Sequence, residues 1–137
     1  AVIFHVPKII VDTAPVGYAT YGKNYIYIPK KIRNVDTGQL ETIKPLIQKI
    51  GNNPRTLFDG NKFHEMGYEY LNNTEDEILD VTKEMFERLD GTFKYSDSGK
   101  LLQKQYYKIF PDNHWAIQAK VVPIGRDFLR DNSHLYT

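Results

Sequence analysis

The stretch NNTEDEILDVTKEMFERLDG, residues 72–91, decides the fold class, because it holds a complete amphipathic helix with both ends marked. Thr74 is a favoured N-cap residue, and Glu77 three positions later completes a capping box. Gly91 suits the left-handed conformation in which many helices end. The sequence therefore predicts a helix over residues 75–90. The residues of its inward stripe recur at helical spacing: Ile78, Val81, Thr82, Met85 and Leu89, widened by Leu79 and Phe86.

A short strand is predicted directly before this helix. Tyr68-Glu69-Tyr70-Leu71 alternates and is rich in aromatic residues, which is typical of strands. A strand that leads into a capped helix is half of a β-α-β unit. The helix N-terminus then lies at the carboxyl end of a strand, where open α/β sheets bind ligands and where helix amides favour anions. The alternative interpretation is an ordinary helix start that the cap only stabilises.

The rest of the chain predicts further strands and helices around this unit. Ile9–Val11 is a continuous apolar run, typical of a strand buried on both faces. The order of elements favours one α/β domain over residues 1–137, with a small, mostly parallel sheet flanked by helices. Strands are predicted at 2–6, 8–11 and 25–28. Helices are predicted near 45–50, at 59–66, at 101–110, from 112 or 113 to 122, and from Pro123 onward.

Composition restricts the classes of function. Lys plus Arg is 18 and Asp plus Glu is 17, so the net charge of +1 predicts no general attraction to nucleic acid or to anionic membranes. The chain has no cysteine, which excludes disulfides and thiolate chemistry. No apolar run approaches the roughly 20 residues of a membrane span. No two of the four histidines have the spacing of a metal site, so the sequence predicts neither a metal nor a cofactor.

Polar side chains at strand ends and at the helix cap are the candidate binding residues. Lysines directly after a strand can neutralise a diphosphate, and an Asp-Thr pair at a strand end can hold a ribose or sugar hydroxyl. Each has a structural alternative: a solvated basic turn, strand-end turn chemistry, or helix capping. The candidates are Asp12, Thr13, Lys30, Lys31, Asn73 and Thr74.

Several short motifs occur in a characteristic order along the chain. They are Ile28-Pro29-Lys30-Lys31, Phe63-His64-Glu65-Met66-Gly67-Tyr68-Glu69, Asn73-Thr74-Glu75-Asp76-Glu77-Ile78, Glu84-Met85-Phe86-Glu87-Arg88-Leu89-Asp90-Gly91 and Gly125-Arg126-Asp127-Phe128-Leu129-Arg130-Asp131-Asn132. This set resembles the C-terminal part of a family of bacterial glycosyltransferases for surface polysaccharides. Members of that family have a Rossmann-like, GT-B-type architecture. The resemblance spans roughly residues 2–132.

The resemblance implies the distal part of a Rossmann-like nucleotide-sugar domain in a cytoplasmic enzyme. The partners it implies are a nucleotide-sugar donor and a missing N-terminal domain or another subunit. Two departures stand out: Glu75 occupies a position where the family often has proline, and the Gly-rich turn that faces the donor is absent. We therefore expect a fragment of a larger two-domain glycosyltransferase, inactive by itself, with catalytic residues unassigned. An incomplete domain would expose apolar surface, so self-association into a homo-oligomer is also expected.

Two other classes of function compete with this interpretation. A truncated half-site can keep the fold and lose the chemistry, which would leave a non-catalytic interaction domain. Interleaved Tyr and Lys residues at 18–31 and 100–108 would suit nucleic-acid binding, but the near-neutral net charge argues against that.

Overall fold

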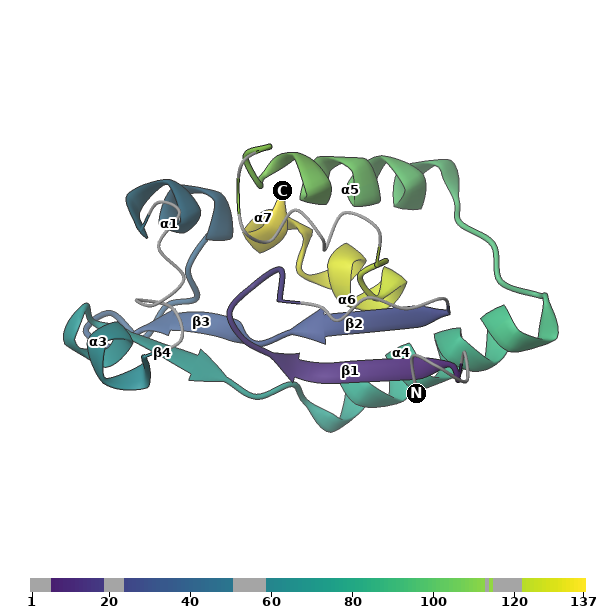
Figure 1. Ribbon diagram of the computed structural model, residues 1–137, viewed down its shortest axis with the longest axis horizontal. Helices are drawn as coiled ribbons and strands as arrows, with labels where there is room; N and C mark the ends of the chain where they lie inside the picture. The colour runs from purple at the N-terminus through teal and green to yellow at the C-terminus, as the bar shows by residue number, and fades with distance from the viewer. Residues whose placement is uncertain (1–5, 19–23, 51–58, 113, 115–121) are drawn as a thin grey trace.

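A computed structural model describes residues 6–18, 24–50, 59–112, 114 and 122–137 (Figure 1). The fold is mixed α/β, as predicted, with two short sheets and helices around them. The elements in chain order are β1 (Lys8–Thr13), β2 (Tyr25–Pro29), β3 (Lys31–Asn34), α1 (Ile43–Ile50), α3 (Gly60–Glu65), β4 (Tyr68–Leu71), α4 (Glu75–Asp90), α5 (Asp97–Lys108), α6 (Arg126–Asp131) and α7 (Ser133–Tyr136).

The first sheet is parallel and places β2 at the centre of the molecule. β1 pairs with β2 in a register that sets Ile10 opposite Tyr27, and Tyr27 pairs on its other side with Ile124. All five residues of β2 are buried, as expected for a strand with neighbours at both edges. The predicted parallel pairing is therefore confirmed for this sheet.

The second sheet is antiparallel, and here the prediction of a mostly parallel sheet was wrong. β3 pairs with β4 so that Lys31 faces Leu71 and Asn34 faces Tyr68. Arg33 and Glu69 form an ion pair across the two strands. From their sequence, the residues after β2 are expected to form a basic cluster and a polar turn. They form a strand because only Lys30 separates β3 from β2, so the chain continues outward and β4 runs back beside it.

Three helix starts differ from the predicted ones. α5 begins at Asp97, four residues before the predicted Leu101, because the Ser96 hydroxyl caps it by accepting a hydrogen bond from an amide of the first turn. α1 begins at Ile43 and contains Pro45 in its first turn, where a missing N–H costs little. α6 begins at Arg126 and not at Pro123.

Two predictions fall wholly or largely outside the described residues, namely the strand over 2–6 and the helix reaching 122. By contrast, α4 spans exactly the predicted residues, and its capping box is present.

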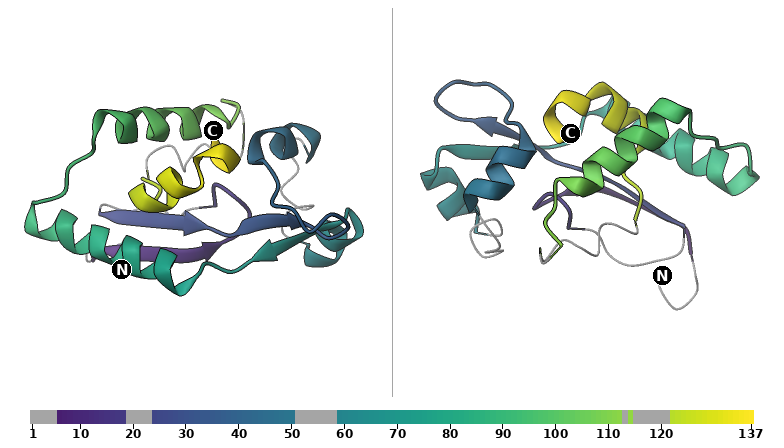
Figure 2. Two further views of the ribbon diagram at one scale, coloured as in Figure 1. Left: turned by 180° about the vertical axis from the view of Figure 1, so that it is seen from behind. Right: turned by 90° about the horizontal axis from the view of Figure 1, so that it is seen from above.

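The helices divide between the two ends of the molecule. Figure 1 shows α1 and α3 near β3 and β4 at one end, and α4, α5 and α6 around β1 and β2 at the other. The rotated views of Figure 2 show the same division. α4 packs on both β1 and β2, while α6 contacts α4 and α5. The core is built around β2 and the helices that cover it.

The inward face of α4 is narrower than its sequence suggests. Val81 and Met85 are buried as predicted, but Leu79, Phe86 and Leu89 are exposed. A carboxylate, Glu84, takes the buried place between them with 0% of its surface exposed. The predicted stripe was wrong at these positions because α4 packs on β1, β2 and α6 with one side only, and a helix packed in this way buries an apolar stripe roughly 100° wide.

Glu84 is buried because it fixes the start of α6. One oxygen of its carboxylate accepts a hydrogen bond from the Arg126 backbone N–H at 2.6 Å, and the other accepts from Arg88 Nη2 at 2.8 Å. The N-cap residue of α6 is Gly125, which has no side chain to offer. Arg88 also stacks on Phe93, with its guanidinium carbon 3.9 Å from the ring centroid. Glu84 therefore serves as a cap from a different helix.

The pH dependence of stability should carry a signature of this carboxyl group. Burial raises the pKa of Glu84 above its ordinary range, against the opposing effects of the Arg126 backbone N–H and Arg88. A carboxyl with a raised pKa in the folded state stabilises the fold most when it is protonated. The free energy of unfolding of the wild type, relative to Glu84→Gln, should therefore fall as pH rises through the folded pKa. Chemical denaturation of both proteins across the acidic range measures this, and parallel pH profiles would contradict it.

A second buried polar contact joins β2 to α5. The hydroxyls of Tyr27 and Tyr106 lie 2.5 Å apart, and both side chains are fully buried. Burial raises the pKa of both phenols, so both remain protonated and one donates to the other.

Tyr27→Phe should lower the free energy of unfolding by about 1–3 kcal/mol, because it leaves the Tyr106 hydroxyl buried without a partner. Tyr27→Phe combined with Tyr106→Phe should recover most of that loss, since neither hydroxyl then remains. A double-mutant cycle from denaturant melts would measure the coupling, and additive losses would contradict it.

Candidate functional site

Three strand ends meet at one place, which we call the junction: residues 12–13, 29–31 and 71–77. Thr13 pairs with Pro29 where β1 and β2 end, and Lys31 pairs with Leu71 where β4 ends. The N-terminus of α4 follows Leu71 after three residues. All six residues predicted from the sequence lie in the junction. They come together because two parallel strands end at the same edge and β4 runs toward that edge.

Asn73 links the parts of the junction to each other. It is buried, its side-chain oxygen accepts a hydrogen bond from the Asp12 backbone N–H at 2.7 Å, and its amide donates to the Pro29 carbonyl at 2.9 Å. In return, the Asp12 carboxylate accepts from the Asn73 backbone N–H at 2.6 Å. This reciprocal pair joins residues 61 positions apart in the sequence. Asn73 is thus a structural tie between β1, β2 and α4.

Asn73→Ala should lower the free energy of unfolding by about 2–3 kcal/mol, because it leaves the half-buried Asp12 N–H and the buried Pro29 carbonyl without these partners. Asn72→Ala is the matched control, since Asn72 is exposed and directly precedes it. Denaturant melts of both variants compare the two positions. Equal, small losses would show that the tie contributes little.

The first turn of α4 is occupied by its own side chains. Glu77 accepts from the Thr74 backbone N–H at 3.0 Å, and the Thr74 hydroxyl accepts from the Glu77 N–H at 3.2 Å. Lys31, the first residue of β3, forms an ion pair with the same Glu77 carboxylate. An anion that bound here would have to displace Glu77. The predicted capping role of Glu77 is confirmed, but its ion pair was not predicted, because it depends on β3 starting close to the first turn of α4.

Asp12 adopts a backbone conformation that few side chains other than Asp and Asn tolerate. Its φ is 53°, and the register of β1 with β2 is interrupted between Ile10 and Thr13 at this position. Such a conformation costs of order 1–3 kcal/mol and persists where the surroundings enforce it. Here the two hydrogen bonds to Asn73 enforce it. The second carboxylate oxygen of Asp12 makes no hydrogen bond with any described residue.

The other two predicted residues differ in accessibility. Thr13 is buried, and its hydroxyl faces the Ile28 carbonyl at the long distance of 3.5 Å. Lys30 is half-buried; its backbone N–H donates to the Thr13 carbonyl, and its carbonyl accepts from the Tyr136 hydroxyl. Its ammonium group makes no hydrogen bond or ion pair within the described ranges. Lys30 is therefore the cation of the junction that is available to a ligand.

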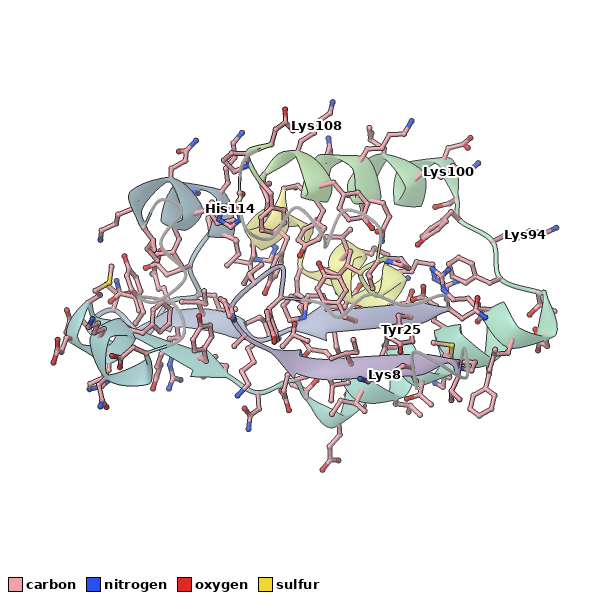
Figure 3. All side chains as sticks on the ribbon, in the orientation of Figure 1. Lys8, Tyr25, Lys94, Lys100, Lys108 and His114 are labelled. Atoms are coloured by element: carbon pink, nitrogen blue, oxygen red, sulfur yellow. The ribbon has the colours of Figure 1, made fainter. Side chains whose placement is uncertain are left out.

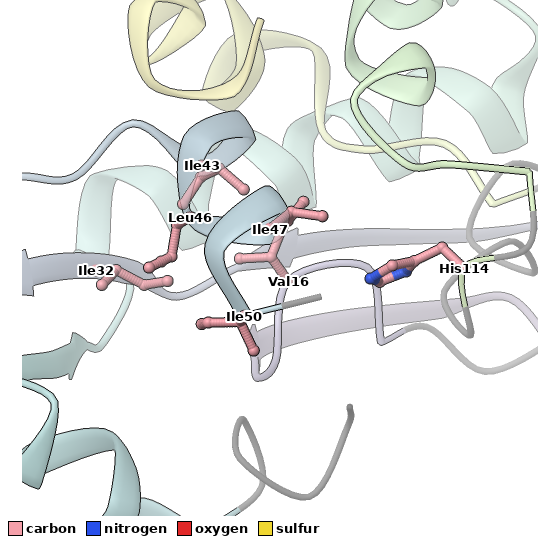
Figure 4. A pocket seen from close by; sticks show the side chains of 7 residues that line it. All are labelled: Val16, Ile32, Ile43, Leu46, Ile47, Ile50 and His114. Carbon is pink, nitrogen blue, oxygen red and sulfur yellow. The ribbon is translucent and has the colours of Figure 1, made fainter. Parts of the chain in front are cut away.

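A separate hollow lies beneath α1 and is apolar (Figure 4). Its lining includes Val16, Ile32 and side chains of α1, and His114 closes one side. Its volume of about 10 Å³ is room for roughly one water molecule. Burial lowers the pKa of His114, which favours the neutral imidazole there. The hollow is a packing gap and not a substrate site.

The described part of the chain lacks two further kinds of feature, a metal centre and a membrane-spanning helix. No three side chains among its His, Asp and Glu residues come close enough to hold a metal ion. None of its helices combines the length and the apolar character needed to cross a bilayer.

Comparison of the chain with models of protein families, with curated proteins and with solved structures found no match in any of the three.

Proposed function

We propose that this chain is the donor-binding part of a glycosyltransferase, and that a nucleotide sugar lies across the junction. The observation that carries the proposal is the convergence of polar residues from three distant segments at the carboxyl ends of β1 and β2. In open α/β sheets, ligands bind at that edge. The ordered motifs that resemble polysaccharide glycosyltransferases support the same class of ligand.

Two cations at the junction suit a diphosphate. Lys30 offers an ammonium group directly, and Lys31 can exchange its Glu77 partner for a phosphate oxygen. In glycosyl transfer, the bond between the sugar and the nucleoside diphosphate breaks, the oxygen of an acceptor hydroxyl bonds to the sugar, and the hydroxyl proton passes to a base or to solvent. Negative charge then grows on the departing diphosphate, and positioned cations stabilise it. The unpaired oxygen of Asp12 would accept a hydrogen bond from a sugar or ribose hydroxyl. The acceptor would be bound by another domain or subunit.

Thermal denaturation with UDP-, GDP- and CMP-sugars tests donor binding. A ligand that binds only the folded state at about 100 times its Kd adds about 2.7 kcal/mol of stability. A UDP- or GDP-sugar, which carries the diphosphate that the two lysines suit, should raise the melting temperature, and Lys30→Ala should remove most of that rise. Lys62→Ala is the control, because Lys62 is exposed in α3, outside the junction. Absence of a shift with all three ligands at millimolar concentration would refute direct donor binding by this chain.

A non-catalytic interaction domain is the second candidate. The observation that favours it is the exposed apolar face of α4, where Phe86 is 66% exposed, Leu89 53% and Leu79 50%. These side chains are spaced along one side of the helix, and exposed apolar patches mark protein contacts. Light scattering over a range of concentrations measures self-association through this face. Phe86→Ser should then shift the equilibrium toward monomer, whereas Lys62→Ser at an exposed position of α3 should not. A wild type that stays monomeric would count against a homo-oligomer.

A further inference from the structure

The outer face of α5 carries a row of lysines. Lys100, Lys104 and Lys108 are spaced four residues apart, so they lie along one side of the helix. The buried residues of α5, Gln103 and Tyr106, lie on the opposite side. Figure 3 shows Lys100 and Lys108 at the outer margin of the molecule, beyond the body of the fold. The row is therefore directed toward solvent.

Two further lysines extend the row at its ends. Lys94 lies in the connection before α5, and Figure 3 shows it at the right-hand edge of the molecule, beyond the end of α5 that carries Lys100. Lys44 of α1 lines a shallow hollow of about 190 Å³ together with Lys108 of α5 and Gln105. Ile109 and Thr137 complete that hollow. We call these five lysines (44, 94, 100, 104 and 108) the lysine face.

Few carboxylates offset the lysine face. Asp97 is the one acidic residue of α5, and it contacts Lys100 at 3.6 Å with both side chains exposed. Such exposed pairs contribute little. Lys44, Lys94, Lys104 and Lys108 form no ion pair with any residue that the structure describes. In contrast, α4 carries seven carboxylates and only two cations. The net charge of +1 therefore conceals a basic side and an acidic side.

We infer that the lysine face docks the protein on an anionic phospholipid surface. Lysines on one helix face are attracted to such a surface by about 1 kcal/mol each, which is roughly fivefold in binding per residue. The hollow is lined by two lysines, one from α1 and one from α5, and by Gln105, which are residue types that suit a headgroup phosphate. Leu101 is 55% exposed beside the lysines and can reach the acyl boundary. This inference does not depend on the proposed donor site, because the two surfaces share no residue.

The chemistry of the face favours lipid over nucleic acid. Binding of single-stranded nucleic acid needs exposed aromatic rings on which bases can stack. The aromatic residues of α5 are Tyr106, which is fully buried, and Tyr107, which is half-buried and donates to the Val122 carbonyl. The face thus presents charge and one aliphatic side chain without a stacking platform.

Vesicle flotation tests the inference with the whole chain. Vesicles of phosphatidylcholine mixed with phosphatidylglycerol should carry the protein upward at low salt, and pure phosphatidylcholine vesicles should not. Lys100→Gln, Lys104→Gln and Lys108→Gln combined should weaken binding about 100-fold, since three contributions of about fivefold are lost. High salt should weaken wild-type binding through screening.

A charge-matched control separates local from general attraction. Lys8→Gln, Lys62→Gln and Lys83→Gln combined remove the same charge from exposed positions outside the lysine face, and binding should remain within a few fold of wild type. Circular dichroism confirms that both triple variants are folded. The inference is overturned if the mixed vesicles do not bind the protein or if both triple variants lose binding equally. It is also overturned if a single-stranded oligonucleotide competes fully at lower concentration than the vesicles.

Discussion

Glu84→Ala is expected to lower the free energy of unfolding by about 3 kcal/mol, one of the two largest effects we predict. Three losses combine. The backbone N–H of Arg126 loses its acceptor, which is worth about 1 kcal/mol for a helix cap. Arg88 loses a buried partner; the usual 3–5 kcal/mol for breaking such a pair is reduced here, because the Arg88 side chain is 24% exposed and water can reach it. A cavity also forms beside Val81 and Met85.

Comparison with Glu84→Gln isolates the charge. Glutamine keeps an oxygen for the Arg126 N–H and fills the same space, so it should lose less stability than alanine. Denaturant melts at neutral pH measure the three proteins. Glu87→Ala is the control on the same helix, since Glu87 contacts Arg126 only at the half-exposed edge of α4. If Glu84→Ala and Glu87→Ala cost the same, the capping role assigned to Glu84 is wrong.

Gly125→Ala is expected to have a similar effect, about 2–3 kcal/mol, for a steric reason. A Cβ atom at this position would lie 2.7 Å from Ile28 Cγ2 and 3.4 Å from Val81 Cγ2. Ile28 is fully buried and branched at Cβ, so it cannot rotate away without a new clash. Gly125 is required where β2, α4 and α6 approach most closely, and its backbone N–H donates to the Tyr27 carbonyl at 2.9 Å.

A double-mutant cycle checks this contact. Ile28→Ala by itself leaves a cavity and destabilises, but combined with Gly125→Ala it makes room for the new methyl group. The combined loss should therefore be smaller than the sum of the single losses. Gly60→Ala is the control, because a Cβ there meets no atom within 4 Å. A loss of less than about 0.5 kcal/mol for Gly125→Ala would show that the three elements can move apart.

Glu84 and Gly125, the two positions just discussed, lie at one contact. Variants there should change stability but not donor binding. Glu84 and Gly125 hold α6 against α4 and β2, whereas the junction lies at the other end of α4, near Glu77. Variants at the α6 contact should lower stability without changing which nucleotide sugar binds. Lys30→Ala should weaken nucleotide-sugar binding without lowering the free energy of unfolding. This separation allows loss of donor binding to be distinguished from loss of folding.

The residues of the candidate site could be predicted from the sequence because the ends of strands and the start of a helix can be recognised there. Asp12, Lys30 and Asn73 were chosen because each follows an apolar strand or begins a helix, and the structure does bring them to one place. Their contacts were not predictable, because they depend on which strands are neighbours. Glu77 is the clearest case: its place in a capping box was predicted, but its ion pair with Lys31 arises only because the first residue of β3 lies close to the first turn of α4.

Local signals in the sequence alone determined α4 and its cap. Thr74, Glu77 and Gly91 satisfy backbone groups within a few residues of themselves, so their meaning does not depend on the rest of the fold. The strand predicted over residues 25–28 was also determined locally, because a continuous apolar run is typical of a buried strand; the structure extends it to Pro29.

Only the tertiary structure decided the direction of β3 and β4, the burial of Glu84 and the place of α6. Strand pairing joins residues far apart in the chain, and the same alternating pattern serves parallel and antiparallel neighbours. A glutamate within a helix is ordinarily expected to face solvent. Glu84 can be buried because its carboxylate accepts hydrogen bonds from the Arg126 N–H and from Arg88. Capping and hydrophobic periodicity therefore determined the helix within residues 72–91, whereas hydrogen bonds and ion pairs between distant segments determined how the other elements are arranged around it.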